Sequence, residues 1–77
     1  MENFIILAGN RKQFEDFRNS EFRIGVNLIY GDRPEKILGV RVNRVKVIGT
    51  FWDRNDAKKL YELTMSRFID KITEISN

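Results

Sequence analysis

An uninterrupted apolar run near the start of the chain constrains the fold more than any other feature. Residues 4–8 read Phe-Ile-Ile-Leu-Ala and are followed by Gly9-Asn10. A continuous apolar run of this length is typical of a strand that is buried on both faces, whereas a half-exposed strand alternates apolar and polar side chains. We therefore interpret residues 4–8 as a strand that other elements cover on both sides.

Helical and strand-like segments alternate through the middle of the chain. Residues 11–19 have the pattern of a short amphipathic helix, and residues 22–30 alternate apolar and other side chains as a strand does, at least from Val26 onward. Residues 34–38 begin with proline and precede a glycine, which predicts a helix of one or two turns. The apolar residues within 44–50 predict a third strand.

The last third of the chain predicts one long helix. From about Arg54 to near the end, apolar side chains recur at helical spacing without proline or glycine. Such a helix is about 34 Å long, whereas a strand of five or six residues spans about 17–20 Å. Its second half still has several apolar residues, and we expect it to pack on the core, to contact a partner or a second copy, or to fray. The apolar residues of this half are Met65, Phe68, Ile69, Ile72 and Ile75.

The predicted order of elements is β-α-β-α-β-α, which favours a single α/β domain over residues 1–77. Strands separated by helices favour a small three-stranded parallel sheet in the order 2-1-3, with flanking helices and the long C-terminal helix. The alternative is an α+β fold in which residues 22–30 form an antiparallel hairpin with residues 38–49, because both segments alternate.

Composition excludes several functional classes. The chain has 77 residues with no cysteine and no histidine, which removes disulfides, the usual zinc ligands and a serine–histidine catalytic pair. No apolar run reaches the roughly 18 residues of a membrane span, and the N-terminal segment lacks the basic start of a secretory signal. We expect no metal, no cofactor, no enzymatic activity and a location in the cytoplasm.

A modest basic stripe suggests one kind of binding. The net charge is +3, and no acidic residue occurs between Glu35 and Asp53. The glycine and cations at positions 9–12 suggest a phosphate site at the start of a helix, although no P-loop spacing is present. The alternative function is therefore binding of nucleic acid or nucleotide phosphates. The residues predicted for it are Arg11, Lys12, Arg33, Arg41, Arg44 and Lys46.

A tryptophan beside an arginine suggests another kind of binding. Trp52 lies in the predicted loop between the third strand and the last helix, close to Arg54. Tryptophan and arginine are enriched among the residues that dominate the affinity of protein interfaces. The predicted partner-binding residues are Trp52, Arg54, Met65, Ile69 and Ile72, and the C-terminal helix is a possible homodimer interface.

Three short segments carry a resemblance to a known group of proteins. They are residues 5–11 (IILAGNR), residues 37–41 (ILGVR) and residues 45–54 (VKVIGTFWDR). Together they resemble small accessory proteins of tailed bacteriophages, which combine a Rossmann-like β-α-β start, an L-x-G-x-R turn and a V-x-V-x-G-T-x-W-x-R strand. The middle portion is also similar to a strand of helicase-like P-loop domains, but the P-loop itself is absent.

The resemblance implies a phage protein that acts in the cytoplasm of a bacterial host. It implies no active site. From the residues and the resemblance together, we expect a non-enzymatic protein that binds a bacterial host or phage protein and modulates it.

Overall fold

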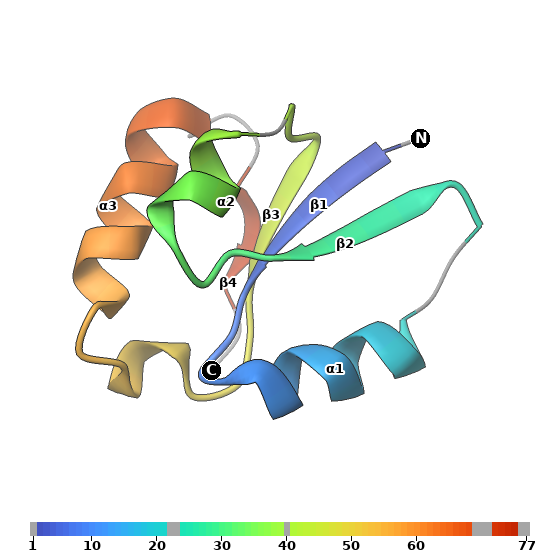
Figure 1. Ribbon diagram of the computed structural model, residues 1–77, viewed down its shortest axis with the longest axis horizontal. Helices are drawn as coiled ribbons and strands as arrows, with labels where there is room; N and C mark the ends of the chain where they lie inside the picture. Colours follow the sequence, from blue (N-terminus) through green and yellow to red (C-terminus); the bar gives the residue numbers. More distant parts are fainter. Residues whose placement is uncertain (1, 22–23, 40, 69–71, 76–77) are drawn as a thin grey trace.

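A parallel sheet forms the centre of the molecule (Figure 1). The computed structural model describes residues 2–21, 24–39, 41–68 and 72–75. The elements, in chain order, are β1 (Glu2–Leu7), α1 (Arg11–Ser20), β2 (Val26–Tyr30), α2 (Pro34–Leu38), β3 (Arg44–Val47), the 3-10 turn η1 (Phe51–Asp53), α3 (Ala57–Phe68) and β4 (Ile72–Ile75).

The strand order is β2-β1-β3-β4, and all neighbours are parallel. Phe4 of β1 aligns with Leu28 on one side and with Arg44 on the other. The α/β class and the predicted parallel order 2-1-3 are therefore confirmed. The hairpin alternative is wrong, because β2 pairs with β1 and β3 lies on the far side of β1.

The C-terminal part of the chain differs from the prediction. α3 ends at Phe68, and Ile72–Ile75 forms a fourth strand beside β3 instead of continuing the helix. Ile72 aligns with Val45 and Ile75 with Val47 across a one-residue irregularity. Because of this irregularity, Ile72 and Ile75, which are three residues apart, align with Val45 and Val47, which are two residues apart. A three-residue spacing that is typical of a helix therefore also fits this strand. Isoleucine and threonine also favour strands, and β4 covers the outer edge of β3.

The shorter helix removes the basis of one prediction. α3 has 12 residues, so within the part of the chain that the structure describes no long helix overhangs the sheet. The homodimer prediction rested on that overhang and therefore has no structural support.

Helices cover the two faces of the sheet unequally. Figure 1 shows α2 and α3 on one side and α1 alone on the other. Alternate residues of β1 point to the two sides, and Ile5 and Leu7 pack with buried residues of α2, β3 and α3. Ile6 and Ala8 pack with Phe14 of α1 on the opposite side. Below, this second side is called the α1 face. Residues on the α1 face that stay partly exposed are Phe4, Phe17, Leu28 and Ile48.

Candidate functional site

The carboxyl ends of β1 and β3 meet at the position where open parallel sheets usually bind ligands. From β1 the chain leaves to α1 on one face, and from β3 it leads to α3 on the other, so the connections diverge there. Ligands of such folds bind in the crevice between the two diverging loops. In this chain the crevice lies between Gly9 and Thr50.

The side chain of Gln13 fills this crevice. Its Oε1 accepts hydrogen bonds from Gly9 N at 2.9 Å and from Thr50 N at 3.1 Å. Its Nε2 donates to Thr50 Oγ1 at 2.9 Å. A Cβ atom at Gly9 or Gly49 would collide with the Gln13 amide. A neutral amide therefore takes the main-chain donors that would otherwise face an anion.

The residues at the start of α1 explain why the Gln13 side chain lies in the crevice. Asn10 caps the helix, because its Oδ1 accepts from Gln13 N at 2.9 Å. Asn10 and Gln13 thus form a variant of the capping box, in which the Gln13 side chain reaches back to Gly9 instead of to the cap residue itself. The Asn-x-x-Gln spacing was the signal for it in the sequence. In this conformation Gly9 N and Gln13 N are already bonded, which argues against the predicted phosphate site.

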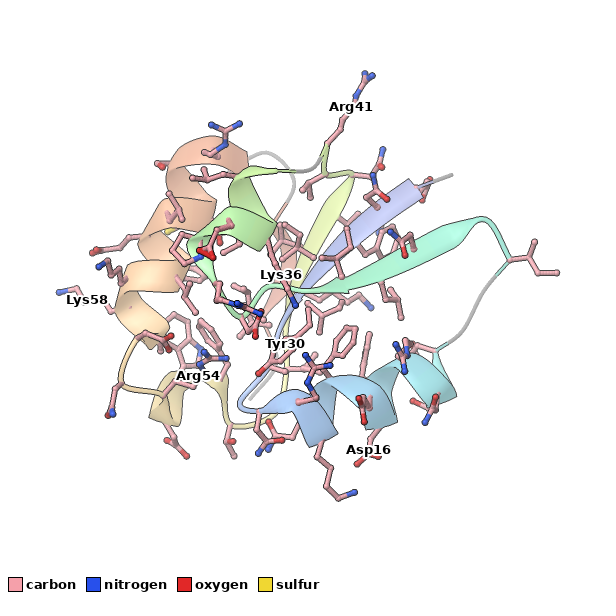
Figure 2. The ribbon with its side chains drawn as sticks, viewed as in Figure 1. Asp16, Tyr30, Lys36, Arg41, Arg54 and Lys58 are labelled. Atoms are coloured by element: carbon pink, nitrogen blue, oxygen red, sulfur yellow. The ribbon has the colours of Figure 1, made fainter. Side chains whose placement is uncertain are left out.

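Arg54 joins the ends of three elements beside the crevice (Figure 2). Its guanidinium donates to Ala8 O at 3.2 Å, to Tyr30 Oη at 3.1 Å and to Asp32 O at 3.4 Å. It also forms a two-point pair with Asp56, at 2.7 and 3.0 Å. The side chain is only 17% exposed. Arg54 therefore turns inward and holds the sheet ends, and little of it is left for a partner.

The Arg54–Asp56 ion pair favours the charged form of both side chains. The hydrogen bond from Arg54 holds the pKa of Asp56 below its ordinary value, and the same bond is the main reason that the pKa of Arg54 is raised. The folded state therefore binds the Asp56 proton less readily than the unfolded chain. The stability that this pair contributes is complete above the ordinary aspartate pKa and is lost as the pH falls through the lowered value.

Among the described residues, an open hollow lies beside β2 and away from the crevice at the sheet end. It measures about 440 Å³, a volume in the range of ligand pockets, and lies between α1, the outer side of β2 and α2. We call it the β2 groove. Its lining residues are Arg11, Phe14, Arg18, Leu28, Ile29, Tyr30, Glu35, Lys36 and Gly39.

Tyr30 is the centre of the β2 groove. Its ring stacks on Phe14 with centroids 5.1 Å apart and planes 13° from parallel. The charged ends of Arg11 and Lys36 lie 5.8 and 5.9 Å from the ring centroid, within the range of cation–π attraction. Figure 2 shows Lys36 and α1 on opposite sides of Tyr30. The groove therefore combines an aromatic floor with a cationic rim.

The predicted basic residues do not gather into one patch. Arg11 and Lys12 lie on α1 and form exposed ion pairs with Glu15 and Asp16. Arg33 is in the loop before α2, and Arg41 is at the opposite end of the sheet from Tyr30 (Figure 2). The remaining two are on the α1 face, where they lie close to aromatic rings. They are Arg44, 5.9 Å from the ring of Phe4, and Lys46, 5.7 Å from the ring of Phe17.

The predicted partner-binding residues are also divided. Trp52 is 42% exposed in η1, and its ring leans on Tyr61 of α3 with centroids 4.8 Å apart. Met65 is half-buried on α3. Ile69 lies outside the described residues, and Ile72 is in β4 instead of a helix. Only Trp52 and Met65 thus keep the placement that the prediction gave them.

Sequence reasoning missed most residues of the β2 groove. Phe14 and Arg18 are four apart on α1, a spacing that places them on one helix face, but nothing in the sequence showed that α2 would bring Lys36 to the same hollow. The structure also has no metal-ligand cluster and no helix long and apolar enough to cross a membrane, within the residues it describes. Comparison with family models, curated proteins and solved structures found no match.

Proposed function

We propose that this chain is a non-enzymatic interaction protein that binds another protein and modulates it. The observation that supports this most is the position of the β2 groove. The crevice where α/β enzymes bind small ligands is filled by Gln13, whereas the β2 groove is an open hollow of the described residues along the edge of the sheet. Sheet edges are surfaces that bind protein segments.

The resemblance to phage accessory proteins supplies the biological setting of this proposal. On that basis the partner is a bacterial host or phage protein, and the site of action is the host cytoplasm. The exposed Trp52 offers a second contact surface, on the η1–α3 side of the molecule.

Affinity capture tests the proposal. The tagged chain should retain a stoichiometric protein from bacterial lysate, and retention should survive nuclease treatment and moderate salt, because protein contacts do not depend on a phosphate backbone. Trp52→Ala and Arg18→Glu, each made alone, then assign the contact to η1 or to the β2 groove. Lys58→Glu on α3 is the matched control for the charge change. Loss of all retained protein upon nuclease treatment contradicts the proposal.

One observation favours nucleic acid as the second candidate. Arg44 and Lys46 lie over Phe4 and Phe17 on the half-covered α1 face, and aromatic rings beside cations are the usual platform for single-stranded nucleic acid. Such binding weakens steeply with salt. Retention of an oligonucleotide that falls by powers of ten over a few-fold rise in salt would make this candidate the leading one.

A further inference from the structure

The main chain of β2 uses only alternate residues to bind β1. Glu2 N donates to Gly25 O at 2.8 Å, and Gly31 N donates to Ile6 O at 3.0 Å. In a parallel pair, the N–H and C=O groups of one residue point to the same neighbouring strand, and those of the next residue point away. Odd-numbered residues of this segment therefore face β1. The residues whose main-chain groups point out of the sheet are Val26, Leu28 and Tyr30.

These outward groups form an open strand edge. β2 ends the strand order, and among the described residues none bonds to the outer N–H or C=O of these three positions. Edge strands are usually blocked by lysine, proline or a bulge. β2 reads Val-Asn-Leu-Ile-Tyr and pairs with β1 in unbroken register, so it has none of these devices.

The charges around this edge select the kind of chain that it can bind. Three cations and one carboxylate line the β2 groove. Arg11 also pairs with Glu15 at 3.7 Å, and because both side chains are exposed, this ion pair is weak and exchanges readily. Lys36 pairs with Asp32 at 3.3 Å, where the side chains are 35% and 20% exposed, so Lys36 already has a half-buried carboxylate partner. Arg18 lies over Phe14 and pairs with no carboxylate of the described residues. The groove therefore favours an anionic occupant.

We propose that the β2 edge binds an extended acidic segment of the partner protein as an additional strand. The inference rests on the proposed function and names the chemistry of the partner. The segment's main chain would bond to Leu28 and Tyr30, which gives affinity independent of sequence. Its carboxylates would face Arg11 and Arg18 on the α1 side of the groove.

A second copy of this chain fits the edge less well. Pairing of two β2 strands would bring two identical cationic rims together, and like charges across an interface oppose association. Nucleic acid would satisfy the cations but would leave the row of main-chain donors and acceptors without a strand partner. An acidic peptide satisfies both features.

Fluorescence anisotropy with two labelled peptides tests the proposal. The first alternates valine and glutamate, and the second alternates valine and lysine, so both have the alternation of a strand and they carry opposite charges. The full chain should bind the acidic peptide saturably and at least about tenfold more tightly than the basic one, a difference that corresponds to one decade in Kd. The affinity should fall as salt is added.

Variants separate the main-chain contact from the charges. Leu28→Pro removes an N–H that points away from β1, so the β1–β2 ladder stays intact, and binding should weaken at least about tenfold. Leu28→Ala is its control, because it loses the same side chain and keeps the N–H. Arg18→Glu should weaken binding by a similar factor, whereas Lys58→Glu on α3 should not change it.

Three outcomes would overturn the inference. They are equal affinity for the two peptides, absence of saturable binding, and sedimentation that shows a concentration-dependent dimer abolished by Leu28→Pro. The third result would assign the edge to a second copy. Protein capture that survives nuclease and requires Trp52, but not Arg18 or the Leu28 N–H, would contradict this inference and leave the proposed function intact.

Discussion

Replacing Arg54 with alanine is expected to lower the free energy of unfolding by about 3 kcal/mol. The guanidinium donates to two main-chain carbonyls, to the Tyr30 hydroxyl and to Asp56, and its removal leaves these acceptors without a donor near the buried end of the sheet. Arg54→Lys keeps the charge but cannot reach several acceptors at once, so we expect an intermediate loss. Urea unfolding measures both variants against the wild type.

The control for Arg54 is Lys58→Ala. Lys58 is exposed on α3, and its replacement should change stability by less than about 0.5 kcal/mol. The difference between wild type and Arg54→Ala should also shrink below about pH 4, because protonation of Asp56 removes the pair that lowers its pKa. An Arg54→Ala protein as stable as Lys58→Ala would show that the guanidinium contacts are absent in solution.

Replacing Gly49 with alanine should lower the free energy of unfolding by about 2 kcal/mol or more. Gly49 has a φ of 58°, which strains any residue with a Cβ atom, and that atom would also strike the Gln13 amide in the crevice. The change therefore combines backbone strain with loss of the hydrogen bonds that Gln13 makes to Gly9 and Thr50. Chemical denaturation measures the total.

Gly25 separates the two causes. It also has a positive φ, 86°, but a Cβ atom there would meet nothing within 4 Å. Gly25→Ala should therefore show the strain alone, about 1 kcal/mol. Gly49→Ala in a Gln13→Ala background should likewise fall to about that value, because the clash is gone and the effects of contacting residues are not additive. Equal losses for Gly25→Ala and Gly49→Ala would mean that Gln13 does not occupy the crevice.

The sequence allowed the order of the first three strands to be predicted because each of them has its own local signal. The apolar run at residues 4–8 predicted a strand buried on both faces. Pro34 and Gly39 predicted the start and the end of α2 at its observed bounds. The end of α3 could not be predicted in this way. Ile72 and Ile75 are three residues apart, which fits a helix, and only the irregular register beside β3 makes the same spacing fit a strand.

The candidate site was predictable only in part, because its geometry depends on contacts between distant segments. Trp52 lies between β3 and α3, as predicted, whereas its exposure could not be predicted from its position in the sequence. Arg54, which was predicted to contact a partner, points inward instead. This could not be predicted, because its carbonyl acceptors are 22 and 46 residues away and leave no pattern in the sequence. The β2 groove joins α1, β2 and α2 and depends on β2 being an edge, which only the complete strand order shows.

Amide hydrogen exchange of the free chain, followed residue by residue by NMR, tests the central claim most directly. If the crevice is closed by Gln13 and the β2 edge is open, the amides of Gly9 and Thr50 exchange slowly, whereas those of Leu28 and Tyr30 exchange much faster than the ladder amides of Asn27 and Ile29. Protection of Leu28 and Tyr30 together with fast exchange at Gly9 and Thr50 would contradict the claim. It would place the open binding site at the end of the sheet.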